Sequence, residues 1–126
     1  MLIDFPDYPH GANQTAADVQ NKFFGSGNPS NYPFDSLHNY YQRSSYNQVN
    51  IQGDVLGWYT ASHNRDYYRD LADTTGVGLV PLVEEALNYY NGGAGGDHDF
   101  TQYDNNGDGR IDGFYIKWTG PIGAFR

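Results

Sequence analysis

Apolar residues recur along the chain at two spacings, and each spacing predicts a different kind of element. The clearest helical pattern lies in residues 79–91, where apolar positions recur every three or four residues over three turns. Pro81 suits the first turn of such a helix, and Gly92-Gly93 suits its end. One apolar stripe faces the predicted core, formed by Leu79, Leu82, Val83, Ala86, Leu87 and Tyr90.

Two more helices are predicted earlier in the chain. The first begins after Thr15, which forms the pattern of a capping box with Asp18, and ends near Phe24. The second begins at Asp35 or Ser36. Its expected apolar face is made of Leu37, Tyr40 and Tyr41. The glycine- and proline-rich residues 25–33 between the two helices are predicted to be a loop.

Strands are predicted where the spacing falls to two or where short apolar runs end at prolines or glycines. The mixture of helices and strands predicts an α/β fold, a small sheet covered by about three helices. Residues 61–78 are polar and contain glycines, and they predict no regular element. Neither a repeat nor a linker interrupts residues 1–126, which predicts a single domain. The expected strands or extended segments are residues 2–5, 48–52, 55–59 and 114–119.

Composition narrows the class of protein and of partner. Aromatic residues make up 17% of the 126 residues, which indicates a folded domain despite a hydrophobic fraction of only 38%. The net charge of −8 argues against nucleic acid or an anionic membrane as partner and favours a divalent cation. The chain lacks cysteine, so it holds neither disulfides nor a cysteine-based zinc site. None of its apolar runs approaches the about 20 residues of a membrane span.

Residues 104–112 carry the strongest chemical signal, a run of oxygen-bearing side chains at alternate positions. Gly107 and Gly109 allow the positive φ angles of a tight wrap around an ion, and Gly109 stands where an EF-hand loop has its turn glycine. Hard oxygen ligands suit Ca²⁺ better than Zn²⁺. The expected ligands are the side chains of Asp104, Asn106, Asp108 and Asp112 and the backbone carbonyl of Arg110.

This calcium assignment has an alternative. The twelfth position of the loop is Tyr115 where an EF-hand has a bidentate glutamate, so the remaining ligands must come from water or from other parts of the chain. The same sequence could also form a surface turn, rich in aspartate, asparagine and glycine, that binds no ion.

The sequence contains no recognisable catalytic motif. His10, His38, His63 and His98 are widely spaced, and no His-Glu-x-x-His occurs in the 126 residues, so the chain carries no zinc-peptidase motif and no catalytic residue is assigned. The tyrosine pairs at 40–41, 67–68 and 89–90 are interpreted either as a carbohydrate-stacking platform or as the edges of the core.

Several segments together resemble the M6 family of zinc metallopeptidases, the immune inhibitor A type. The strongest likeness lies in residues 99–113, which are similar to that family's calcium loop and the strand after it. The likeness covers nearly the whole chain in order. The other similar segments are residues 3–7, 24–25, 36–46 and 55–59.

The resemblance implies a metzincin-like fold and a secreted bacterial or archaeal enzyme that hydrolyses proteins and uses Zn²⁺ only in its full-length form. The zinc-binding helix of that family lies beyond the last predicted strand. We therefore expect residues 1–126 to be the N-terminal, calcium-binding part of the peptidase domain, inactive alone, with its export signal outside this chain. Self-association through an exposed sheet edge is also expected. The alternative is a free-standing, calcium-stabilised module that binds proteins or glycans through its tyrosines.

Overall fold

The computed structural model describes residues 1–26, 35–77 and 79–121. Most of the loop predicted at 25–33 therefore lies outside the described residues. The chain divides into two compact units. Unit 1 comprises Met1–His10 and Trp58–Arg126, and unit 2 comprises Gly11–Gly57. None of the described helices combines the length and the apolar character that a membrane crossing requires.

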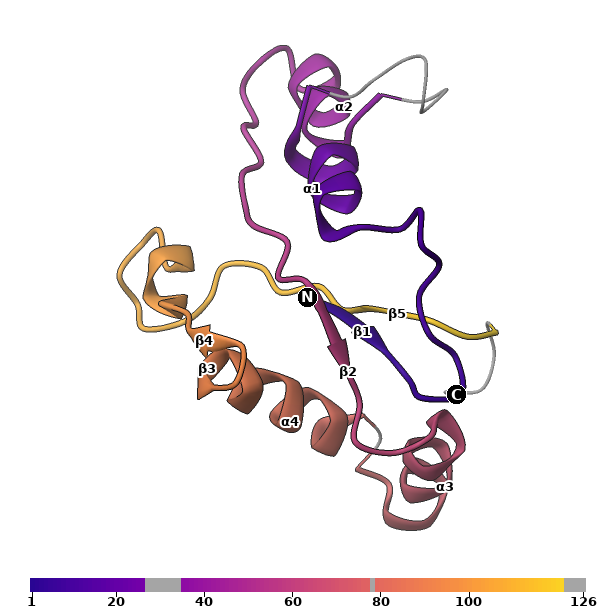
Figure 1. Ribbon diagram of the computed structural model, residues 1–126. Coiled ribbons are helices and arrows are strands. Elements are labelled where there is room, and N and C mark those ends of the chain that lie inside the picture. The colour runs from indigo at the N-terminus through magenta and orange to yellow at the C-terminus, as the bar shows by residue number, and fades with distance from the viewer. Residues whose placement is uncertain (27–34, 78, 122–126) are drawn as a thin grey trace. The chain divides into compact units, whose positions relative to one another are not determined.

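Unit 1 is built on a three-stranded parallel sheet whose central strand is β1, Leu2–Asp4 (Figure 1). β2, Trp58–Thr60, lies on one side of β1 and β5, Lys117–Trp118, on the other. In register, Leu2 pairs with both Trp58 and Lys117. Every residue of β1 is buried, as expected for the middle strand of a parallel sheet. The strand predicted at 2–5 is confirmed in this way, whereas the one predicted at 114–119 is shortened to two residues.

Helix α4, Val80–Tyr90, confirms the strongest helical prediction and carries Pro81 in its first turn. Leu82 and Ala86 on its inner face are completely buried, and Tyr90 is 8% exposed. The chain then forms a small antiparallel hairpin, β3 (Asn91–Gly93) and β4 (Gly96–Asp97), followed by the 3₁₀ helix η1, Phe100–Tyr103.

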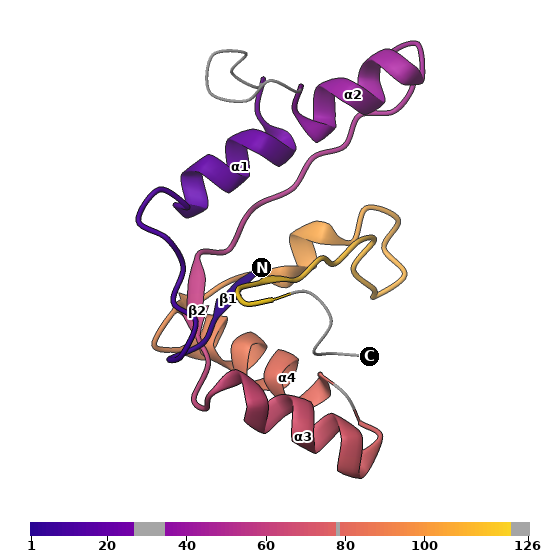
Figure 2. The same ribbon diagram turned by 90° about the vertical axis from the view of Figure 1, so that its right-hand side faces the viewer.

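A fourth helix, α3 (Arg65–Thr75), occupies part of the region for which the sequence predicted no element. Its Tyr68 is 1% exposed and packs its ring 5.9 Å from that of Phe5. The Tyr68 hydroxyl also donates a hydrogen bond to Glu85 of α4, and the two helices are neighbours in both ribbon views (Figure 1 and Figure 2). Burial, and then this carboxylate, raise the pKa of the Tyr68 phenol. Tertiary packing of one aromatic face thus stabilises a polar helix.

Unit 2 contains α1, Ala16–Phe24, and α2, Leu37–Ser44, which pack against each other. The predicted capping box is confirmed, because Thr15 Oγ1 accepts a hydrogen bond from Asp18 N at 3.1 Å and Asp18 Oδ2 accepts one from Thr15 N. Ser36 is the N-cap of α2, whose start was predicted at Asp35 or Ser36. The expected apolar face of α2 is not buried, since Tyr40 and Tyr41 are both exposed.

The strand predicted at residues 48–52 is wrong, because this segment has no regular structure and Val49 is exposed. Side chains take the place of a strand partner along this part of the chain. Gln20 donates through Nε2 to the carbonyl of Gly53 at 2.9 Å and accepts through Oε1 from the amide of Val55 at 2.6 Å. His38 Nδ1 lies 2.8 Å from the carbonyl of Ile51. Backbone groups that a sheet would have paired are thus satisfied by α1 and α2.

The α4 stripe gives a direct test of the core. Leu82→Ala should lower the free energy of unfolding by about 2–5 kcal/mol, because it removes a fully buried side chain and leaves a cavity. The measurement is chemical denaturation monitored by circular dichroism.

Val80→Ala on the same helix is the matched control, since Val80 is 47% exposed, and it should change the free energy by no more than about 0.5 kcal/mol. Equal effects of the two substitutions would contradict the placement of this helix.

Candidate metal centre

The candidate metal centre is the loop of residues 104–112, which connects η1 to the segment that leads into β5 (Figure 2). Two hydrogen bonds close it at its base. The amide of Asp112 donates to the carbonyl of Tyr103 at 2.9 Å, and the amide of Asn105 donates to Asp112 Oδ2 at 3.1 Å. The two ends of the loop are therefore held side by side.

Asp104 is the centre of the hydrogen bonding in this loop. Its Oδ1 accepts hydrogen bonds from the amides of Gly107 at 2.7 Å and Asp108 at 3.1 Å, and its Oδ2 accepts one from Gly109 at 2.7 Å. The chain can wrap this tightly because Gly107 and Gly109 have φ angles of 72° and 80°. The expected positive φ at both glycines is confirmed.

Asn106 and Asp108 continue the wrap. Asn106 Oδ1 accepts from the amide of Asp108, and Asp108 Oδ1 accepts from the amide of Arg110, both at 2.9 Å. Asn106 Nδ2 donates to Asp108 Oδ2 at 3.3 Å. The side chains of all four predicted ligands thus bond to the loop's own backbone. Residues 105–112 are exposed to solvent and Asp104 is half-buried.

The oxygen atoms of the loop are of the kinds that bind calcium, whereas the loop itself is folded as a hydrogen-bonded turn. A carboxylate offers about four lone-pair sites, so an oxygen that accepts an amide hydrogen bond keeps further capacity for a cation. Carboxylate, amide and carbonyl oxygens are the ligands of Ca²⁺ and do not suit Zn²⁺. In the described parts of the chain, no three side chains of His, Cys, Asp or Glu lie close enough together to hold a metal ion.

The four histidines lie at separate places, each beside its own partner. His98 Nε2 is 2.8 Å from the Tyr103 hydroxyl, directly before the loop. His63 packs against the Tyr67 ring, while His10 contacts Asp4 and His38 contacts a backbone carbonyl. Together with the missing His-Glu-x-x-His, this spacing means that the residues present do not fit a peptidase zinc ion.

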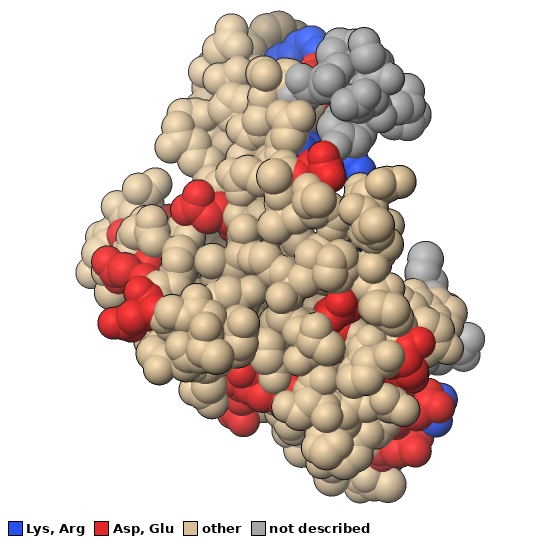
Figure 3. All heavy atoms as spheres, viewed as in Figure 1, with Lys and Arg blue, Asp and Glu red and all other residues tan. Residues whose placement is uncertain are grey.

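Asp99 anchors the 3₁₀ helix that precedes the loop. Its Oδ1 accepts from the amide and the hydroxyl of Thr101, at 2.9 and 2.6 Å, and these hydrogen bonds lower the pKa of the Asp99 carboxyl. A carboxylate bound in this way is a helix cap. Acidic side chains also appear at several other places on the face drawn in Figure 3, as the net charge requires.

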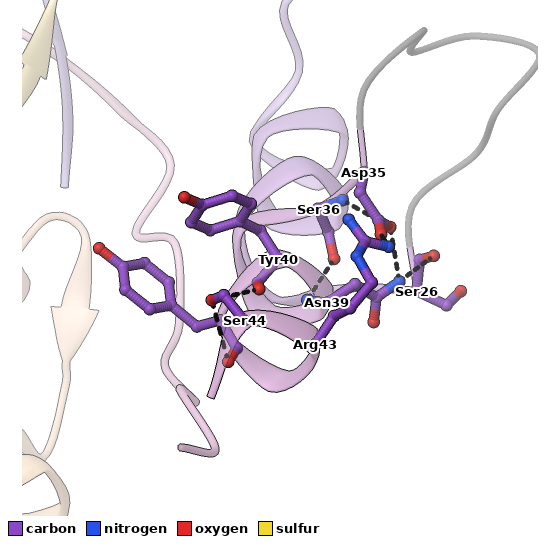
Figure 4. A network of polar contacts seen from close by, with 8 residues as sticks. Ser26, Asp35, Ser36, Asn39, Tyr40, Arg43 and Ser44 are labelled. Atoms are coloured by element: carbon purple, nitrogen blue, oxygen red, sulfur yellow. Dashed lines mark hydrogen bonds and ion pairs between the residues drawn. The ribbon is translucent and has the colours of Figure 1, made fainter. Parts of the chain in front are cut away.

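The sequence singled out Tyr40 and Tyr41 on α2 but not the turn after this helix. Tyr46 is 89% exposed and has a φ of 55°, and Asn47 follows with a φ of 63°. A left-handed tyrosine is unusual and is not encoded by any local sequence pattern. On the other side of α2, Asp35 accepts hydrogen bonds from Asn39 at 2.8 Å and Arg43 at 2.5 Å, while the Tyr40 ring points away from this network (Figure 4).

Comparison with known proteins places the chain in a family. The model of the immune inhibitor A peptidase M6 catalytic domain matches residues 1–115. The pre-pro-metalloprotease PrtV of Vibrio cholerae serotype O1, from strain M66-2 and from strain ATCC 39315 / El Tor Inaba N16961, is 30% identical over 133 residues. That alignment covers 88% of this chain and 14% of each relative, so the chain spans about one seventh of their length. No solved structure matches it. The chain therefore belongs to the M6 family of immune inhibitor A-type metallopeptidases, within their catalytic domain.

Proposed function

We propose that the chain is the calcium-binding part of the catalytic domain of a secreted zinc metalloendopeptidase that hydrolyses proteins. The observation that carries this proposal is the match of the M6 catalytic-domain model to residues 1–115, which include the whole of the 104–112 loop. The relatives are pre-pro-metalloproteases by name, which supports the reaction class. Calcium sites of modest affinity suit the millimolar calcium found outside cells, which supports an extracellular location.

In this proposal the ion would be held by the side chains of Asp104, Asn106, Asp108 and Asp112 and by the carbonyl of Arg110. Its two positive charges would offset most of the charge of three carboxylates that lie within nine residues. The loop leads into β5, and β5 pairs with the central strand of the unit 1 sheet. Bound calcium would therefore stabilise the connection between η1 and that sheet.

Calcium binding is tested by thermal unfolding of the whole chain in excess CaCl₂ and in EGTA. An ion present at 100 times its Kd stabilises the folded state by about 2.7 kcal/mol, so the melting temperature should rise with calcium. Asp108→Ala should abolish that rise, because it removes one of the three carboxylates. Asp73→Ala, at an exposed position of α3, is the control and should keep it.

Two results would contradict the calcium proposal. One is a melting temperature of the wild-type chain that is the same in calcium and in EGTA. The other is an equal response of the wild-type chain and Asp108→Ala to calcium.

A second prediction concerns catalysis. The isolated chain should not hydrolyse casein, with or without added ZnCl₂, because it has no zinc-binding motif. Release of labelled peptides is the measurement, with thermolysin as positive control. Casein cleavage by the purified chain that EDTA abolishes would show that the chain carries its own catalytic metal site.

Exposed tyrosines favour a second candidate function, a calcium-stabilised module that binds a protein or a glycan. Tyr40, Tyr41 and Tyr46 are 55%, 41% and 89% exposed, where a core edge would have buried them. Tyrosine surrounded by serine and asparagine is typical of recognition surfaces. On a glycan array, a binding module should give a signal that Tyr46→Ser reduces at least about fivefold, because a residue that matters for binding contributes more than about 1 kcal/mol. No signal from the wild-type chain on the array would argue against the glycan form of this candidate.

A further inference from the structure

The chain leaves unit 1 after His10 and re-enters it at Trp58, and these two residues contact each other. Their rings are stacked, with centroids 4.6 Å apart and planes inclined by only 6°. Both residues are half-buried. The two ends of the inserted segment 11–57 are thus joined by a contact between the side chains that flank it.

A buried carboxylate holds this stack in place. Asp4, the last residue of β1, is 3% exposed, and its Oδ2 lies 2.6 Å from His10 Nδ1 and 3.2 Å from the His10 amide. Its Oδ1 is buried and has no hydrogen-bond partner among the described residues. Both hydrogen bonds from His10 therefore converge on a single oxygen of Asp4.

The charge of Asp4 makes this contact stronger than a neutral pair. Burial alone would raise the pKa of the Asp4 carboxyl, but hydrogen bonding, above all from the His10 side chain, outweighs burial and lowers it. The carboxylate is thus ionised at neutral pH, and a hydrogen bond to an ionised group is about twice as strong as a neutral one. The loss of His10 would leave a buried charge with few partners.

The β1–β2 pairing beside this contact is short. β1 and β2 pair over three residues, ending at Asp4 and Thr60, and one further backbone bond joins Ala61 N to Asp4 O at 2.8 Å. Short ladders of this kind fray at their ends. Asp4 lies at the end of this ladder, and its carboxylate holds the His10 ring, which stacks on Trp58 at the start of β2.

We propose that Asp4, His10 and Trp58 form a clasp, a contact that holds together the point where the chain leaves unit 1, at His10, and the point where it returns, at Trp58. Opening the clasp frees the ends of segment 11–57 while the rest of unit 1 stays folded. The clasp is a conformational device.

Amide hydrogen exchange of the whole chain, resolved by NMR, tests this proposal. His10→Gln removes the stacked ring, and Asp4→Asn keeps the shape of the side chain but removes its charge. Each variant should accelerate exchange of the Ala61 amide on the order of tenfold, the scale expected for a lost charge-assisted hydrogen bond. Amides of α4, such as those of Ala86 and Leu87, should keep their wild-type rates.

His98→Gln is the matched control, because the His98 ring also stacks on an aromatic ring, that of Tyr103, and is also half-buried. It should leave the Ala61 rate unchanged. Two results would overturn the clasp. In one, neither His10→Gln nor Asp4→Asn alters exchange at Ala61. In the other, exchange rises equally at Ala61 and throughout α4, which would make the contact an ordinary part of the core.

Discussion

The main-chain pairing of β1 is the constraint on which unit 1 depends. Three consecutive residues, all buried, pair on one side with residues 58–60 and on the other with residues 117–118. Parallel neighbours cannot be joined by a tight turn, so long crossover segments must connect them. One crossover contains unit 2, and the other contains α3, α4 and the loop of residues 104–112. The loop is therefore anchored on one side by the strand that completes the sheet.

Elements that depend on local interactions were predictable from the sequence. The capping box at Thr15 and Asp18 and the apolar stripe of α4 depend on residues that are spaced three or four positions apart along the chain. The glycines at 107 and 109 belong to the same class, because their positive φ angles follow from a tight wrap. Local chemistry determines these features, so one sequence is enough to find them.

Elements that depend on distant partners were not predictable in the same way. Residues 48–52 alternate like a strand, but the side chains of Gln20 and His38 bond to this part of the chain, so no ladder forms. Helix α3 was missed because its polar sequence offers only Asn64 before it and Gly76 after it as signals, while burial of Tyr68 against Phe5 stabilises it. The Asp4–His10 contact likewise depends on how the chain folds back after β1.

Within the candidate metal centre, the sequence predicted the possible metal ligands and their order along the chain, but not the hydrogen bonds that these side chains make. Asp104, Asn106, Asp108 and Asp112 lie on one closed loop, and each accepts hydrogen bonds from backbone amides of that loop. A loop of this kind is compatible both with an ion and with a turn that needs none.

The most direct test of the calcium account is an NMR titration of the ¹⁵N-labelled chain with CaCl₂, followed at the amides of Gly107 and Gly109. The account predicts saturable shifts of these two resonances and of their neighbours in residues 104–112, with a much weaker response to MgCl₂. Unchanged resonances throughout residues 104–112 at millimolar calcium would contradict it and would identify the loop as a hydrogen-bonded turn without an ion.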